Sequence, residues 1–181
     1  MKTSEFACVL IFVGILAFVL GVAVADANAY CEDIDEDIMT AVNGASERYD
    51  IPAELILAVI ETESSFRPDA ENDGCIGLMQ IQKDKLPWLE SEYDRKLDLR
   101  DIEDNVYAGA YILAGYYHKY DIHYALMCYN GGVGYARKMA RKGYESSKYS
   151  RKVVNRYENW IVRCGRAQLS ESAADEAVSV A

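Results

Sequence analysis

Apolar residues recur three and four positions apart along most of the chain, which is the spacing of one face of a helix. No segment alternates apolar and polar residues for long enough to predict an extended sheet. The predicted fold class is therefore all-α, with one small hairpin at most. Helices are expected over residues 35–49, 52–64, 102–120, 123–129, 134–141 and 149–162, with a shorter amphipathic piece within residues 77–90.

The helix expected over residues 52–64 is apolar nearly all round, so it should lie in the middle of the domain. Glu63 lies near its C-terminal end. Burial disfavours an ionised carboxylate and raises its pKa, which suits a general acid at neutral pH. Glu61 points roughly 200° away round the helix and cannot share that site. The pattern alone is equally compatible with an exposed Glu63 that only ends the helix.

The N-terminal segment is typical of an exported protein. Residues 6–25 contain no charged side chain, and Lys2 precedes them. Ala27-Asn28-Ala29 has the form of a signal-peptidase site, so residues 1–29 are interpreted as a signal peptide. A run of about twenty apolar residues also suffices to cross a bilayer, so an uncleaved N-terminal membrane anchor is the alternative. In both cases the rest of the chain lies outside the cytoplasmic membrane, in the cell wall or periplasm, or is secreted.

The remainder of the chain is long enough for one compact domain and too short for two. We expect that domain to span residues 30–166. Residues 167–181 are small, polar and acidic, and we expect them to form a loose tail.

The expected domain contains an even number of cysteines, as is common in exported chains. Two disulfides are therefore plausible, and four buried free thiols are the alternative. No pair of cysteines has the spacing of metal ligands, so no metal site is expected. Nothing else in the sequence indicates a cofactor. The four cysteines are Cys31, Cys75, Cys128 and Cys164.

The charge is distributed unevenly. The whole chain has 19 basic and 29 acidic side chains, a net charge of -10, which argues against binding of nucleic acid. Residues 137–166 instead hold 10 basic and 2 acidic side chains. This segment is either a solvated helix face or a surface for an anionic polymer. Nothing in the sequence indicates a protein partner.

Three motifs bring more specific information. Glu63-Ser64-Ser65-Phe66, Gly77-Leu78-Met79-Gln80 and Tyr129-Asn130-Gly131-Gly132 follow one another along the chain, and Tyr149 comes later. In this order they resemble the soluble lytic transglycosylase family over roughly residues 38–157. The resemblance implies a lysozyme-like helical domain with a substrate cleft, like that of goose-type lysozyme. It also implies that the substrate is the glycan strand of peptidoglycan.

The resemblance implies that Glu63 is the sole catalytic residue. Glu63 would first protonate the glycosidic oxygen between the muramic sugar and its neighbour. The substrate's own N-acetyl group would stabilise the positive charge at the anomeric carbon. Glu63, now ionised, would take a proton from the C6 hydroxyl of the same sugar, so that a 1,6-anhydro product forms without added water.

The same resemblance assigns supporting roles to residues of the motifs. Ser64 would seat the glutamate. Met79 and Gln80 would touch sugar at the floor of the cleft, where Gly77 allows close approach of the backbone. The opposite side of the cleft would be shaped by Tyr129 and Asn130, with Tyr149 hydrogen-bonded near Glu63.

Two positions depart from the family pattern. Cys75 and Cys128 each replace a residue that is commonly a small one, usually alanine. Since both replacements are cysteine, we expect a Cys75–Cys128 bridge across the cleft. The remaining pair, Cys31–Cys164, would then tie the two ends of the domain.

Two other functions remain open at this point. A muramidase of goose-type lysozyme character would keep the fold but use water, and would need a second carboxylate such as Asp69 or Asp73. A non-catalytic wall-binding component of a secretion or conjugation apparatus would need no acid. The basic segment 137–166 would then help either kind of protein to hold anionic wall polymer.

Overall fold

The computed structural model describes residues 34–179, with side chains described as far as residue 165. Residues 34–161 form one compact unit. All of the residues that build the candidate site lie within this unit. The chain from Val162 onward belongs to a second unit. The expected leader, residues 1–29, lies outside the described residues, and no described helix is both long and apolar enough to cross a membrane.

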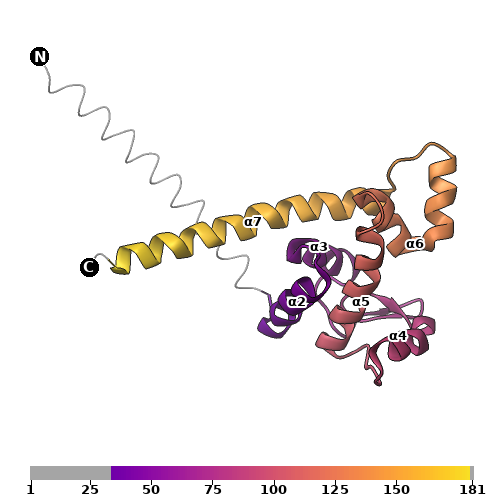
Figure 1. Cartoon of the computed structure of the whole chain (residues 1–181), viewed down its shortest axis with the longest axis horizontal. Helices are drawn as coiled ribbons and strands as arrows, with labels where there is room; N and C mark the ends of the chain where they lie inside the picture. Colours follow the sequence, from indigo (N-terminus) through magenta and orange to yellow (C-terminus); the bar gives the residue numbers. More distant parts are fainter. Residues whose placement is uncertain (1–33, 180–181) are drawn as a thin grey trace, which may run out of the picture. The chain divides into compact units, whose positions relative to one another are not determined.

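The described part of the chain is mostly helical, which confirms the predicted all-α class (Figure 1). Its helices are α2 (Glu36–Tyr49), α3 (Ala53–Glu63), α4 (Leu86–Tyr93), α5 (Ile102–Tyr117), α6 (Ile122–Arg141) and α7 (Lys148–Ser179), with a short 3₁₀ helix η1 (Lys83–Lys85) before α4.

A small antiparallel sheet lies between α3 and α4 in the sequence. Its strands are β1 (Glu71–Asn72), β2 (Cys75–Ile76) and β3 (Ile81–Gln82), arranged in the order β1-β2-β3. Ile76 pairs with Glu71 on one side and with Ile81 on the other. A strand of two residues contains no alternation to detect, so the sequence pattern predicted at most a hairpin here.

Aspartates begin three of the helices. Asp35, Asp101 and Asp121 each precede a helix and accept a hydrogen bond from a backbone N–H in its first turn, at 2.9–3.0 Å. These side chains satisfy donors that a helix leaves without partners, and they interact favourably with its positive end. In these three helices the aspartate therefore determines where the helix begins.

The core is built around α3, as its apolar sequence predicts. Every residue from Leu55 to Ile60 is buried, with at most 1% of its surface exposed. Helix α2 packs on α3 and on α5, and α5 in turn contacts α6 (Figure 1). Because α3 is enclosed in this way, the residue at its C-terminal end is held in a fixed place.

A second apolar cluster joins the sheet to α4 and α5. Ile76 and Ile81 of the sheet pack with Leu89 of α4 and Ala108 of α5. Leu97 and Leu99, in the loop before α5, complete the cluster. It fixes the sheet against the middle of α5.

The two helices expected over residues 123–129 and 134–141 are two halves of α6. The break lies at Gly132, whose φ of 76° and ψ of 164° are not helical. Glycine adopts this positive φ without the penalty of a Cβ atom. After the break, Ala136 packs back against Met127 and Cys128 of the first half.

The last helix is longer than expected. Helix α7 begins at Lys148 and runs to Ser179, so it continues through most of the segment expected to be a loose tail. The alanine, glutamate, glutamine and leucine residues of that segment are all good helix formers.

The bridge expected between Cys75 and Cys128 is wrong, because both thiols are free. Cys128 is only 1% exposed and packs in the apolar cluster of α6. Cys75 lies in β2, in the wall of a different cavity. The two side chains therefore point to different places. The Cys31–Cys164 pairing stays a prediction, since Cys31 lies outside the described residues.

Candidate active site

Glu63 is the last residue of α3, and its side chain is half-buried. Tyr149, in the first turn of α7, donates a hydrogen bond from its hydroxyl to Glu63 Oε1 at 2.6 Å. The two residues are 86 positions apart in sequence. The end of a buried helix and the start of the last helix thus meet at one carboxylate.

The surroundings of Glu63 favour its protonated form. Burial raises the pKa of Glu63, because a charged carboxylate loses contact with water. The hydrogen bond from Tyr149 and the positive charge of Lys152 act in the opposite direction and lower this pKa, but burial is the larger effect. Burial also raises the pKa of Tyr149 well above its ordinary value, so its phenol remains a neutral donor. A glutamate in this state holds a proton to higher pH than an exposed one does.

Glu63 opens into a pocket of about 240 Å³. The pocket is enclosed by the end of α3, by the sheet and by α5 and α6. Its lining residues are Glu63, Asn72, Asp73, Cys75, Gln80, Ile81, Gln82, Lys85, Ile112, Tyr129 and Asn130. Three residues expected at the site from sequence therefore line one cavity together with Glu63.

The loop between β2 and β3, residues 77–80, reaches the pocket at Gln80 and is held by Asn105 of α5. Asn105 is 1% exposed, and its Oδ1 accepts a hydrogen bond from Met79 N at 2.8 Å. Its Nδ2 donates to the carbonyls of Ile76 and Leu99, at 2.9 and 2.7 Å. One side-chain amide therefore satisfies three backbone groups that have no access to water.

Gly77 makes this arrangement possible. It has a φ of 79°, and a Cβ atom there would lie 2.1 Å from Asn105 Nδ2 and 2.5 Å from the carbonyl oxygen of Leu99. No other residue fits both the backbone conformation and the space. The close approach expected at Gly77 is thus to Asn105 and to the backbone of Leu99.

Tyr129 and Gln80 complete the pocket wall. The Tyr129 hydroxyl donates to the carbonyl oxygen of Met79 at 2.8 Å, which ties α6 to the loop of residues 77–80. Gln80 Nε2 donates to the carbonyls of Ala70 and Gly77, at 3.1 and 3.0 Å. Burial raises the pKa of Tyr129 well above its ordinary value, so this phenol is also a neutral donor.

Three of the predicted residues do not line the pocket: Ser64, Met79 and Tyr149, of which Tyr149 contacts Glu63 through its hydroxyl. The hydroxyl of Ser64 is buried and donates to the carbonyl oxygen of Ile60 at 3.1 Å, within its own helix. The side chain of Met79 is fully buried against Gly109 of α5, where a Cβ atom would collide with it. Met79 is therefore not a sugar contact in this conformation, and its backbone rather than its side chain contributes to the site.

The other carboxylates near Glu63 differ in position. Glu61 faces α7, where Trp160 Nε1 donates to it at 2.9 Å and Arg156 lies 3.4 Å away. Of the two candidates for activating water, Asp73 lines the pocket and Asp69 does not. Within the described residues, no cluster of three or more histidine, cysteine or acidic side chains is suited to hold a metal ion.

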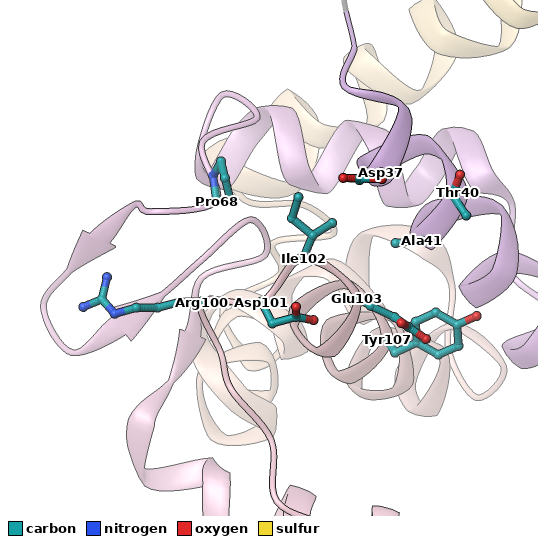
Figure 2. Close-up of a pocket in the computed structure, with 9 residues that line it drawn as sticks. All are labelled: Asp37, Thr40, Ala41, Pro68, Arg100, Asp101, Ile102, Glu103 and Tyr107. Atoms are coloured by element: carbon teal, nitrogen blue, oxygen red, sulfur yellow. The ribbon is translucent and has the colours of Figure 1, made fainter.

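A second pocket, of about 580 Å³, lies between α2, the start of α5 and the loop around Pro68. Figure 2 shows Asp37 and Thr40 on one side and Glu103 and Tyr107 on another. None of the predicted site residues lines it. It is therefore separate from the Glu63 pocket.

Sequence reasoning missed the role of Asn105. A signal for it was present, because Asn105 is a polar residue directly before Val106 and close to Ala108, two apolar residues that are buried in the same helix. A buried amide at such a position must be hydrogen-bonded.

Residues 40–152 match the profile of the transglycosylase SLT domain family. The match covers more than half of the chain, so the protein belongs to this family. The chain is 38% identical over 112 residues to membrane-bound lytic murein transglycosylase C of Pectobacterium atrosepticum, covering 51% of this chain and 30% of the relative. It is 30% identical over 117 residues to a transglycosylase of Enterobacteria phage PRD1, covering 62% of this chain and 40% of the relative.

Two solved structures share the fold. An inactive mutant of the lytic transglycosylase Slt from Pseudomonas aeruginosa superposes with a TM-score of 0.62 at 16% identity, covering 70% of this chain and 24% of that one. The 70 kDa soluble lytic transglycosylase of Escherichia coli gives a TM-score of 0.57 at 19% identity, covering 69% and 25%. The chain thus spans less than half the length of these relatives and structures.

Proposed function

We propose that the protein is a peptidoglycan lytic transglycosylase that cleaves the β-1,4 bond between N-acetylmuramic acid and N-acetylglucosamine. The observation that carries the proposal is the half-buried Glu63, hydrogen-bonded to Tyr149 in a pocket of a domain of the SLT family. The names of the two relatives, a membrane-bound lytic murein transglycosylase and a transglycosylase, support the same activity.

Glu63 performs both proton transfers in the proposed reaction. In its protonated form it gives its proton to the glycosidic oxygen, and the bond from that oxygen to C1 of the muramic sugar breaks. The carbonyl oxygen of the sugar's own N-acetyl group stabilises the positive charge at C1. Glu63 then takes the proton of the C6 hydroxyl, whose oxygen bonds to C1 and closes the 1,6-anhydro ring. Glu63 is protonated again, and no water is consumed.

The reaction uses Glu63 first in its protonated form and then in its ionised form, and different neighbours stabilise each form. Burial favours the protonated acid before the reaction, whereas the Tyr149 hydrogen bond and the charge of Lys152 stabilise the carboxylate that forms during it. Tyr149 is a neutral donor throughout, so it remains in place as the charge on Glu63 changes. In this proposal Gln80, Tyr129 and Asn130 shape the substrate pocket.

Hydrolysis is the second candidate, because Asp73 lines the same pocket as Glu63. A muramidase of this kind uses the second carboxylate to activate a water molecule that attacks C1. The two reactions differ in their products, since hydrolysis adds one water molecule and the transglycosylase reaction adds none.

The proposed site of action is outside the cytoplasmic membrane, where peptidoglycan lies. The relative from Pectobacterium atrosepticum is named as membrane-bound, which agrees with this location. Whether residues 1–29 are removed as a signal peptide or retained as an anchor stays a prediction from sequence.

The role of Glu63 is tested by release of soluble fragments from purified peptidoglycan. Glu63→Gln is expected to abolish release, because the amide neither donates nor accepts the proton. Glu61→Gln is the matched control: it lies on the same helix but faces Arg156 and Trp160, so activity is expected to persist. Retained activity in Glu63→Gln contradicts the proposal.

A further inference from the structure

An exposed aromatic surface lies beside the Glu63 pocket. Trp88, in α4, has 44% of its surface exposed, although its ring is held in place. Its Nε1 donates to Glu92 Oε1 at 3.2 Å, one helical turn along. Its ring lies 5.8 Å from that of Tyr111 in α5, and the two planes are inclined by only 30°. Tyr111 thus covers part of the indole, while 44% of the surface of Trp88 remains open to solvent.

Glu92 links the two aromatic residues. Besides the indole N–H, it accepts a hydrogen bond from the Tyr111 hydroxyl at Oε2, at 2.9 Å. Each carboxylate oxygen therefore has one protein donor and can accept another. The surface formed by Trp88, Tyr111 and Glu92 combines a flat apolar face with free acceptor positions at its edge.

Further rings hold this surface from below. Tyr111 contacts Tyr49 and Tyr93, with ring centroids 5.8 and 6.0 Å apart, and the hydroxyls of Tyr49 and Tyr93 are hydrogen-bonded at 2.5 Å. Arg48 lies over the rings of both tyrosines. A side chain that is already ordered loses little entropy when a ligand binds to it. Trp88 differs in this respect from an isolated exposed aromatic residue.

The surface adjoins the pocket along two elements. Lys85, which lines the pocket, precedes Trp88 by three residues, about one helical turn or 5 Å. Ile112, which also lines the pocket, follows Tyr111 directly in α5. Tyr111 and Ile112 also pack against the same apolar cluster. On this side, the elements next to the pocket are therefore α4 and α5, which carry Trp88 and Tyr111.

We propose that Trp88, Tyr111 and Glu92 form a sugar-binding subsite for an N-acetylhexosamine of the glycan strand, outside the Glu63 pocket. The apolar C–H face of a sugar ring stacks on the free side of the indole, while hydroxyl or amide N–H groups at its edge donate to Glu92. The ligand rests on the proposed function, since the strand is then the substrate. Binding at this subsite requires no proton transfer by Glu63.

Tryptophan fluorescence isolates the subsite. The chain contains two tryptophans, and Trp160 is only 2% exposed. The experiment uses the full chain carrying Glu63→Gln and a β-1,4-linked N-acetylglucosamine hexamer as the probe. The hexamer is expected to shift the emission to shorter wavelength and to protect it from acrylamide quenching. A single N-acetylglucosamine, which is too short to occupy the pocket and the subsite together, is expected to do neither at the same concentration.

Calorimetric titration of variants measures the contribution of the surface. Trp88→Ala is expected to weaken hexamer binding about tenfold, the equivalent of about 1.4 kcal/mol, and Trp88→Phe is expected to weaken it less. Tyr144→Ala removes an aromatic residue that is 55% exposed elsewhere and is the matched control, with unchanged affinity expected. Circular dichroism melting shows whether each variant is folded.

The outcomes separate this proposal from the proposed function. The subsite is overturned if Trp88→Ala binds the hexamer with unchanged affinity and the hexamer leaves the tryptophan emission of the Glu63→Gln protein unchanged. The role of Glu63 then still stands. Absence of both hexamer binding and peptidoglycan cleavage in the unmodified protein overturns the proposed function and the subsite together.

Discussion

Replacement of Asn105 by alanine is predicted to destabilise the protein and to loosen the loop of residues 77–80, which ends at the pocket residue Gln80. The side chain of Asn105 makes three hydrogen bonds to backbone groups of Ile76, Met79 and Leu99, and all three are lost. Alanine offers neither a donor nor an acceptor in their place, and the residue is 1% exposed, so water does not replace the amide without rearrangement.

The magnitude follows from the groups that lose their partners. A buried polar group without a partner costs about 1–3 kcal/mol. The N–H of Met79 loses the acceptor it has in the structure, and the two carbonyls each lose a donor while keeping a second lone pair. We therefore expect Asn105→Ala to lower the free energy of unfolding by about 3 kcal/mol.

Urea unfolding followed by circular dichroism is a suitable assay. With a slope of about 2 kcal/mol per molar urea, the midpoint is expected to fall by about 1.5 M. Asn155→Ala, at an exposed position of α7, is the matched control and should change stability by less than about 0.5 kcal/mol. The prediction is refuted if the urea midpoint of Asn105→Ala lies within about 0.3 M of the midpoint of the unmodified protein, at this slope. The three hydrogen bonds of Asn105 would then contribute little to stability.

Two further predictions concern charge. Tyr149→Phe removes a hydrogen bond that lowers the pKa of Glu63, so this pKa should rise and Glu63 should keep its proton to higher pH. The alkaline limb of the pH profile of kcat/KM should therefore move to higher pH. An alkaline limb that is unchanged or shifted to lower pH contradicts this prediction. Arg137, Lys138 and Arg141 line one exposed pocket of α6. Replacement of all three by glutamine should weaken the binding of the protein to insoluble peptidoglycan and make that binding less dependent on salt. Sedimentation of the protein with peptidoglycan at two ionic strengths measures both effects. The same salt dependence in the variant and the unmodified protein would exclude a contact between these residues and an anionic polymer.

The helices could be predicted because their signals are local. Apolar spacing identified α3 as buried, and its enclosure explains why burial raises the pKa of Glu63. The break of α6 at Gly132 was also visible, since the two halves were expected as separate helices. In contrast, strands of two residues are too short to carry a periodic signal, so the sheet was not predicted.

Contacts between distant residues were harder to predict. No pattern in the sequence pairs Tyr149 with Glu63; only resemblance to a family suggested it. The same resemblance led to the wrong prediction of a Cys75–Cys128 disulfide. The motif places Cys128 next to Tyr129 in sequence, but the side chain of Cys128 packs with Met127 and Ala136 within α6. Met79 was likewise expected in the cleft, and its side chain packs against Gly109 instead.

The central claim is that Glu63 serves as acid and then as base without the help of water. Mass spectrometry of the fragments released from purified peptidoglycan tests it most directly. We expect muropeptides that end in 1,6-anhydro-N-acetylmuramic acid, present with the unmodified protein and absent with Glu63→Gln. Reducing-end fragments heavier by one water molecule would contradict it, and would assign the activation of that water to Asp73, the second carboxylate of the pocket.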